Sequence, residues 1–133
     1  MIPAGACVIA YNAGFEKRVL RDRADWHPDL AGPLLAIEAA TVDLLPIARD
    51  CWYHRDQRGS WSIKAVLPTI APELDYAALK VKDGGNAQEA WAEAARPDCE
   101  PLDSEALAQA LKSYCARDIW AMIAVAWGLT GAT

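Results

Sequence analysis

Residues 6–16 read Ala-Cys-Val-Ile-Ala-Tyr-Asn-Ala-Gly-Phe-Glu, and this stretch decides the fold class. Its first six residues are apolar and partly β-branched, which is typical of a strand buried on both faces in an α/β sheet. Asn12 and Gly14 then favour a turn, followed by a helix to about residue 25 with Phe15 facing inward. We therefore expect an α/β fold with a strand at about 6–11.

The rest of the chain has a mostly helical pattern. Residues 41–45 read Thr-Val-Asp-Leu-Leu and predict a second short strand, which Pro46 would end. A long C-terminal helix is predicted at about 104–127, capped by Asp103 or Ser104. One or two strands cannot form a sheet that buries both of its faces. We therefore expect a partial domain that lacks its first strands.

Length and composition limit the classes of function. The 133 residues suffice for one domain, residues 1–133, and 53% of them are hydrophobic. The net charge of −5 disfavours broad nonspecific adhesion to nucleic acid but allows a local basic groove. The four cysteines form no Cys-x-x-Cys pair, so we expect no zinc site. The sequence shows no secretion signal and no membrane-spanning stretch, which favours a cytoplasmic location without a membrane partner.

Two acidic residues are notable for their positions. Glu16 lies in the first turn of a helix just beyond a buried strand, where ligands gather in open α/β sheets. The same position also suits a carboxylate that merely complements the helix N-terminus. Asp118 lies in a mostly apolar stripe of the last helix, one turn after Tyr114. By itself, this helix pattern favours a carboxylate that accepts hydrogen bonds from a neighbouring loop, with metal binding as the alternative.

Other polar residues leave two interpretations open. Asp43 either touches a site or caps the following turn, and its position favours the cap. Residues 49–64 interleave basic and aromatic side chains, as in surfaces that bind single-stranded nucleic acid, but a solvated loop with aromatics in the core fits equally well. Lys64 is the member that we expect to face the site, and His54 is given no catalytic role.

Four sequence motifs occur in a fixed order. They are Tyr-Asn-x-x-Phe-Glu at 11–16, Val-Asp-Leu at 42–44, Gly-Ser-x-Ser-Ile-Lys-x-Val-Leu-Pro at 59–68 and Tyr-Cys-x-x-Asp-x-x-Ala-Met at 114–122. This set resembles an uncharacterised bacterial family, domain of unknown function 2779. More broadly, the set resembles the DEDD exonucleases of the ribonuclease-H-like superfamily, in the branch with tyrosine in the last motif. The resemblance to domain of unknown function 2779 covers nearly the whole chain, but only the C-terminal two-thirds or so of that domain.

The resemblance implies a ribonuclease-H-like fold and a 3′–5′ exonuclease that hydrolyses phosphodiesters with two Mg²⁺ or Mn²⁺ ions. It makes Glu16 and Asp118 metal ligands, and it makes Tyr114 the residue that orients the attacking water; these three are the expected catalytic residues. Three further residues are expected to bind the single-stranded end of a nucleic acid: Asn12, Lys64 and Arg58.

The sequence departs from the exonuclease pattern in two ways. Glu16 stands where proven exonucleases have the shorter Asp, and no acidic residue precedes it to form the first motif, Asp-x-Glu. Asp-x-Glu does occur at 103–105, where we interpret it as a helix cap. We therefore expect this chain alone to be inactive or nearly so.

Two further expectations complete the sequence interpretation. The alternative to a nuclease is a non-catalytic module that binds nucleic acid or protein on a degenerate nuclease fold. The bare apolar strand edge at 6–11 predicts a homo-oligomer, because an unpaired edge is a template for another chain.

Overall fold

The computed structural model describes residue 3 and residues 5–131, and it divides the chain into two compact units. Unit 1 contains the chain up to Trp61 together with the residues from Ala126 on, and unit 2 comprises Ser62–Val125. Both units are mostly helical, which confirms the predicted helical character of the chain.

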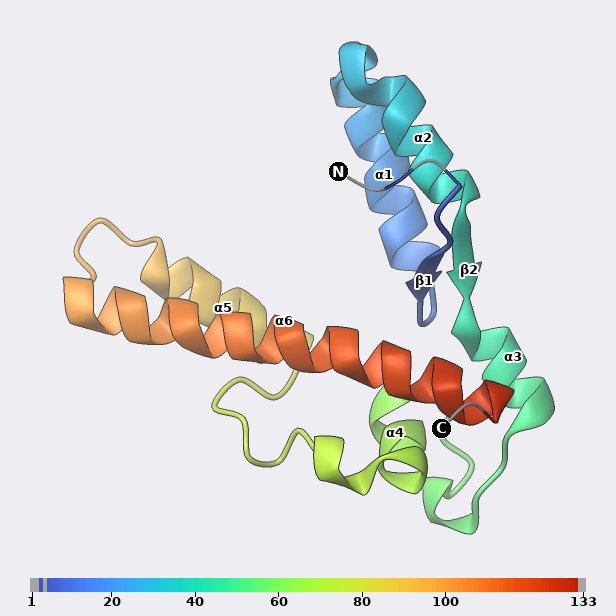
Figure 1. Ribbon diagram of the computed structural model, residues 1–133. Helices are drawn as coiled ribbons and strands as arrows, with labels where there is room; N and C mark the ends of the chain where they lie inside the picture. The colour runs from blue at the N-terminus through green and yellow to red at the C-terminus, as the bar shows by residue number, and fades with distance from the viewer. Residues whose placement is uncertain (1–2, 4, 132–133) are drawn as a thin grey trace. The chain divides into compact units, whose positions relative to one another are not determined.

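Unit 1 is built around a pair of parallel strands, β1 (Val8–Ala10) and β2 (Thr41–Asp43). They are shorter than predicted but lie at the predicted positions. Parallel strands need a crossover connection, and here α1 (Gly14–Trp26) and α2 (Ala31–Ala39) provide it, joined by the short 3₁₀ helix η1 (Pro28–Leu30). The two helices lie side by side next to the strands (Figure 1). A short turn after β1 leads directly into α1.

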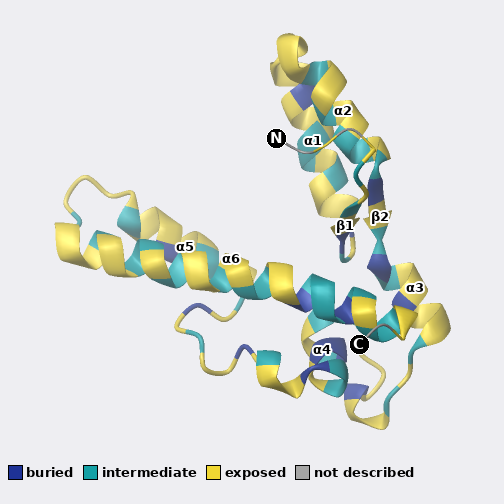
Figure 2. Cartoon of the chain, viewed as in Figure 1, coloured by how far each residue is buried: buried dark blue, intermediate teal, exposed yellow. Residues whose placement is uncertain are grey.

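The two faces of this small sheet differ in burial. Ala10 and Thr41 are buried, whereas the paired residues Ile9 and Val42 are 39% and 41% exposed. Figure 2 shows this mixture of buried and exposed positions along the strands. The prediction of a strand buried on both faces is therefore wrong at Ile9. The inward position predicted for Phe15 is also wrong, because its side chain is 62% exposed.

Unit 1 continues with α3 (Leu44–Cys51), which begins directly after β2. A short 3₁₀ helix, η2 (Arg55–Gln57), follows in a polar loop, residues 54–60. The His54 imidazole accepts a hydrogen bond from the backbone N–H of Asp56, and the Gln57 side chain accepts one from the N–H of His54. These bonds form a capping box, so His54 has a local structural role.

Unit 2 contains α4 (Ile63–Ile70), η3 (Pro72–Leu74), α5 (Gly84–Ala94) and most of α6 (Pro101–Thr130). Its fully buried side chains include Val66, Leu67 and Val125. No regular helix forms between η3 and α5, so this connection is held by side-chain contacts.

The start of α6 differs from the sequence interpretation. The helix begins at Pro101, whose fixed φ suits the first helical position, and Asp103 lies within its first turn. The Ser104 hydroxyl donates a 3.1 Å hydrogen bond to the carbonyl of Ala94 at the end of α5. The interpretation of residues 103–105 as a cap is therefore wrong.

Among the helices in the described part of the chain, none combines the length and apolar character needed to cross a membrane.

Candidate functional site

Asp43 holds the turn after β1 in unit 1. Its Oδ1 accepts hydrogen bonds from the backbone N–H groups of Asn12 and Leu45, at 2.8 and 2.9 Å, and its Oδ2 accepts one from Ala13 at 2.9 Å. The bond to Leu45 caps α3, so the structural role that the sequence favoured for Asp43 is confirmed. One carboxylate thus joins the ends of both strands.

Asn12 lies at the tip of this turn with a φ of 62°, in the left-handed region that asparagine tolerates better than most residues. Its side chain is exposed, and Glu16 is exposed in the first turn of α1. Both residues lie near the carboxyl end of β1, as the sequence predicted. Their roles in binding substrate and metal stay predictions.

Tyr11 connects β1 to the end of the polar loop. Its hydroxyl donates a 2.9 Å hydrogen bond to the carbonyl of Trp61. Burial raises the pKa of Tyr11, Arg49 opposes that rise, and Asp43 adds to it. In the same loop Arg58 is exposed and has a φ of 51°, so it ends η2 in the left-handed conformation. The bond from Tyr11 therefore ties the end of this loop to β1.

Asp118 is the centre of a polar cluster in unit 2. The hydroxyl of Tyr76 donates a 2.6 Å hydrogen bond to Asp118 Oδ1. Tyr114 lies one helical turn before Asp118, and its ring packs against that of Tyr76 with centroids 6.2 Å apart. The sequence alone favoured an Asp118 that accepts hydrogen bonds from a neighbouring loop, and this expectation is confirmed.

Two tyrosine pKa values report the environment of this carboxylate. Burial, followed by the hydrogen bond to Asp118, raises the pKa of Tyr76 far above its usual value. Burial and then the charge of Asp118 raise the pKa of Tyr114 to about 12. Both phenols therefore stay protonated at neutral pH and can donate to the carboxylate.

Basic residues fix the segment that carries Tyr76. Lys64 Nζ lies 5.5 Å from the centroid of the Tyr76 ring, within the range of a cation–π contact, and donates a 2.6 Å hydrogen bond to the carbonyl of Lys82. Arg117 donates a 2.9 Å hydrogen bond to the carbonyl of Asp75. Arg117 is half-buried against this segment.

Three of the six predicted site residues thus belong to unit 2, and Tyr76 contacts all three: Lys64, Tyr114 and Asp118. The other three belong to unit 1: Asn12, Glu16 and Arg58. The sequence interpretation missed Tyr76. In the sequence, Tyr76 is marked only as a large aromatic residue in a short irregular stretch. This stretch lies between Pro72 and Asp83, the residue that caps α5.

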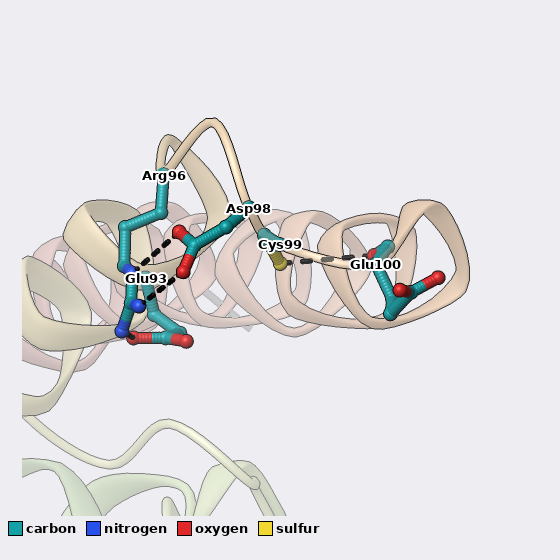
Figure 3. Close-up of polar contacts among 5 residues, drawn as sticks. All are labelled: Glu93, Arg96, Asp98, Cys99 and Glu100. Atoms are coloured by element: carbon teal, nitrogen blue, oxygen red, sulfur yellow. Dashed lines mark hydrogen bonds and ion pairs between the residues drawn. The ribbon is translucent and has the colours of Figure 1, made fainter.

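A second group of charged residues lies where α5 meets the loop before α6 (Figure 3). Arg96 donates to both oxygens of Asp98, at 3.0 and 2.6 Å, and to Glu93 at 3.2 Å. The guanidinium lowers the pKa of Asp98, while burial and then Glu93 raise the pKa of Cys99. A cavity of about 350 Å³ next to these residues is lined by none of the predicted site residues. The group is best explained as a local support for the loop.

A hard divalent ion prefers carboxylate oxygens, and Asp118 carries such a group. Within residues 3 and 5–131, however, no group of three or more His, Cys, Asp or Glu side chains is arranged to hold a metal ion. Asp118 therefore fits a metal as a single ligand, not as part of a complete set.

The chain was compared with known protein families and structures. Residues 1–62 match the model of a family described as a domain of unknown function (DUF2779). The match contains the motifs at 11–16 and 42–44 and ends inside the motif at 59–68, so the motif at 114–122 lies outside it. No solved structure matches the chain.

A curated relative extends over more of the chain. It is a protein of Mycoplasma pneumoniae named "Uncharacterized protein MG366 homolog". The two are 31% identical over 132 aligned positions, which cover 88% of this chain and 19% of the relative. The chain thus spans about a fifth of the length of the curated relative that it matches.

Proposed function

We propose that the chain is part of a metal-dependent 3′–5′ exonuclease that acts on the single-stranded ends of nucleic acid. The observation that carries the proposal is the half-buried pair of Tyr114 and Asp118, one turn apart on α6, with the carboxylate accepting a hydrogen bond from Tyr76. A carboxylate offers about four lone-pair positions, so this one phenol donor leaves room for a metal ion. Two such ions, when bound, stabilise the attacking and leaving oxygens of phosphodiester hydrolysis.

The residues of the chain take distinct parts in this proposal. Asp118 is a metal ligand, and Tyr114 orients the attacking water through its protonated hydroxyl. Lys64, a cation beside the same cluster, binds the phosphate backbone. Glu16 keeps the metal role that the resemblance gives it, and Asn12 and Arg58 keep their expected roles in binding substrate.

The proposal extends the family match from residues 1–62 to the whole chain and adds the ribonuclease-H-like fold. The matching relative is about five times as long as the aligned part of this chain, so the parent protein has room for the missing acids. Only two of the four acids expected at a two-metal site are assigned here. The chain alone is therefore expected to hydrolyse little or no nucleic acid.

Metal binding tests the proposal in this chain. Thermal unfolding of the wild type is compared with that of Asp118→Asn in millimolar Mn²⁺, with Asp50→Asn, an exposed acid in α3, as the matched control. An ion that binds only the folded state at a hundred times its Kd stabilises by about 2.7 kcal/mol. We expect Mn²⁺ to stabilise the wild type and Asp50→Asn but not Asp118→Asn. Equal stabilisation of all three would overturn the role of Asp118.

Hydrolysis tests the parent protein. The longer protein is incubated with Mg²⁺ and single-stranded DNA or RNA labelled at the 5′ end. We expect stepwise shortening from the 3′ end, lost in Asp118→Asn. Robust hydrolysis by the 133-residue chain alone would contradict the proposal that it carries only two of the four acids of the active site.

A non-catalytic binding module is the second candidate, and a specific observation favours it. Asp43 and Asp118 are both fully explained by hydrogen bonds within their own units. Acids held in this way need no metal to account for their burial. Absence of any Mn²⁺ effect on the wild type, together with binding of a single-stranded oligonucleotide, would favour this candidate.

A homo-oligomer is proposed on the exposed face and edge of the β1–β2 sheet. Ile9 and Val42 are neighbours on this face and are both about 40% exposed, although parallel sheets are usually covered on both faces. A charge on an edge strand discourages further pairing. We expect the mass by light scattering to rise with concentration in the wild type but not in Ile9→Lys. The control is Leu102→Lys, at an exposed position of unit 2. A wild type that stays monomeric at high concentration would exclude this interface.

A further inference from the structure

A groove runs along the hairpin of α5 and α6 in unit 2. The two helices lie side by side (Figure 1), and the Ser104 hydroxyl bonds to the carbonyl of Ala94 near the loop that joins them. Two cavities of about 350 and 430 Å³ follow this hairpin, and Lys80, Glu93 and Leu107 line both of them. The shared lining makes the two cavities neighbouring parts of one groove.

The walls of the groove have the spacing of a helix-packing surface. Each helix contributes side chains at positions i, i+3, i+4 and i+7, which lie on one face of an α-helix. From α5 these are Asn86, Glu89, Ala90 and Glu93. From α6 they are Asp103, Ala106, Leu107 and Ala110. Two such stripes side by side offer a seat for a third helix.

The floor of the groove is apolar and its rim is acidic. Val81 and Ala90 are buried, and Leu107 is half-buried between the two helices. Among the described residues that line the two cavities, Lys80 is the one cation. The exposed acids of the same lining are Glu89, Glu93, Asp98, Glu100 and Asp103.

The negative charge of the rim extends into the groove. Arg96 bonds to Glu93 and Asp98 at one end and offsets part of their charge (Figure 3). Nevertheless, burial and then the charges of Glu93 and Asp103 raise the pKa of the Cys99 thiol, which lines the same end. A cationic side chain at the rim is therefore attracted to it.

We propose that this groove docks a basic amphipathic helix of a protein partner. The apolar side of that helix covers Ala90 and Leu107, and lysine or arginine side chains on its flanks face Glu89 and Asp103 across the rim. Each stripe of the groove extends about 10 Å along its helix, so a partner helix of two to three turns fills it. The inference is independent of the proposed nuclease function.

A designed peptide tests the docking. The probe is a fluorescein-labelled helical peptide with leucine at positions i, i+3, i+4 and i+7 and lysine on both flanks, and fluorescence anisotropy measures its Kd for the whole chain. The control ligand has glutamate in place of every lysine. We expect saturable binding of the lysine peptide that weakens as salt rises, and no binding of the glutamate peptide.

Three variants locate the binding surface, and circular dichroism shows whether each is folded. Glu89→Gln combined with Asp103→Asn removes two exposed rim charges and should raise the Kd by about fivefold. Glu73→Gln combined with Glu105→Gln removes the same net charge from exposed acids that line neither cavity, and should leave the Kd unchanged. Ala106→Trp fills the groove from an exposed position without altering its charge and should abolish binding.

The results distinguish docking in the groove from other modes of binding. If the two double variants bind alike, or if Ala106→Trp binds as tightly as the wild type, net charge alone attracts the peptide and the proposal is wrong. A wild type that does not bind the lysine peptide also overturns it. If the wild type instead forms a dimer that Ala106→Trp dissociates, the occupant is a second copy of the chain and not a basic partner.

Discussion

The hydroxyl of Tyr76 donates a 2.6 Å hydrogen bond to Asp118 Oδ1 and thereby joins an irregular segment to the long helix α6. A hydrogen bond to a charged group contributes about 1.5–3 kcal/mol. We expect Tyr76→Phe to lower the free energy of unfolding by about that amount, measured by urea denaturation. In a double-mutant cycle with Asp118→Ala, the two losses should be clearly less than additive, because both substitutions remove the same bond. Strictly additive losses would show that the bond contributes nothing.

Alkaline pH should weaken the fold through Tyr114. Its folded-state pKa is raised to about 12, whereas an unfolded tyrosine titrates near 10. Above pH 10 the unfolded chain binds fewer protons at this residue than the folded chain does, so stability is complete below about pH 10 and falls as pH rises towards 12.

Urea unfolding at a series of pH values from 8 to 11.5 measures this effect. Tyr76 and Tyr11 have raised pKa values as well, so part of the loss is expected to persist in Tyr114→Phe. The slope of stability against pH should nevertheless be shallower in Tyr114→Phe than in the wild type. The exposed control Tyr53→Phe should keep the wild-type slope. Identical slopes in all three proteins would show that Tyr114 does not titrate differently in the folded state.

Asp43 should contribute more to stability than any surface acid. Asp43→Ala removes the acceptor of three backbone N–H groups, including the cap of α3, and we expect a loss of about 2 kcal/mol or more. Asp43→Asn keeps one acceptor oxygen and should lose less. The matched control Asp50→Ala, on the exposed side of α3, should change stability by about 0.5 kcal/mol or less. A similar loss in both alanine variants would refute the role given to Asp43.

The backbone at Asn12 separates a conformational role from a role in binding. Its φ of 62° suits glycine and disfavours β-branched residues, so Asn12→Gly should leave stability nearly unchanged and Asn12→Val should cost about 1–2 kcal/mol. Thermal unfolding measures both. If the Asn12 side chain also binds nucleic acid, Asn12→Gly will weaken oligonucleotide binding while the fold stays intact. A stable Asn12→Val would show that the turn adapts.

Local patterns predicted the elements of the fold well. The β-branched stretches around Val8 and Val42 form strands, and the periodic stripe through Asp118 forms a helix. The exposed positions of Phe15 and Ile9 were not predictable in this way, because hydrophobicity tells only that a side chain tends to be buried. Which side chains are covered depends on the number of strands and helices that assemble beside them.

The site was predictable only where it lies on regular structure. Tyr114 and Asp118 are one turn apart on a helix, so their proximity follows from helical geometry. Tyr76 reaches them across 42 residues from a stretch with no periodicity, and no local pattern encodes such a contact. The start of α6 was predicted a few residues too late. Asp103 and Ser104 are typical N-cap residues and were taken as the cap, although Pro101 is typical of the first helical position.

Unit 1 is assembled from the two ends of the chain: the segment up to Trp61 and the residues from Ala126 on. Unit 2 lies entirely between them in sequence. A ribosome adds roughly 5–20 residues per second. The last turns of α6 are therefore synthesised several seconds after the segment that contains β1 and β2. Unit 2 can close during this delay. Until those turns are made, unit 1 lacks part of its own chain.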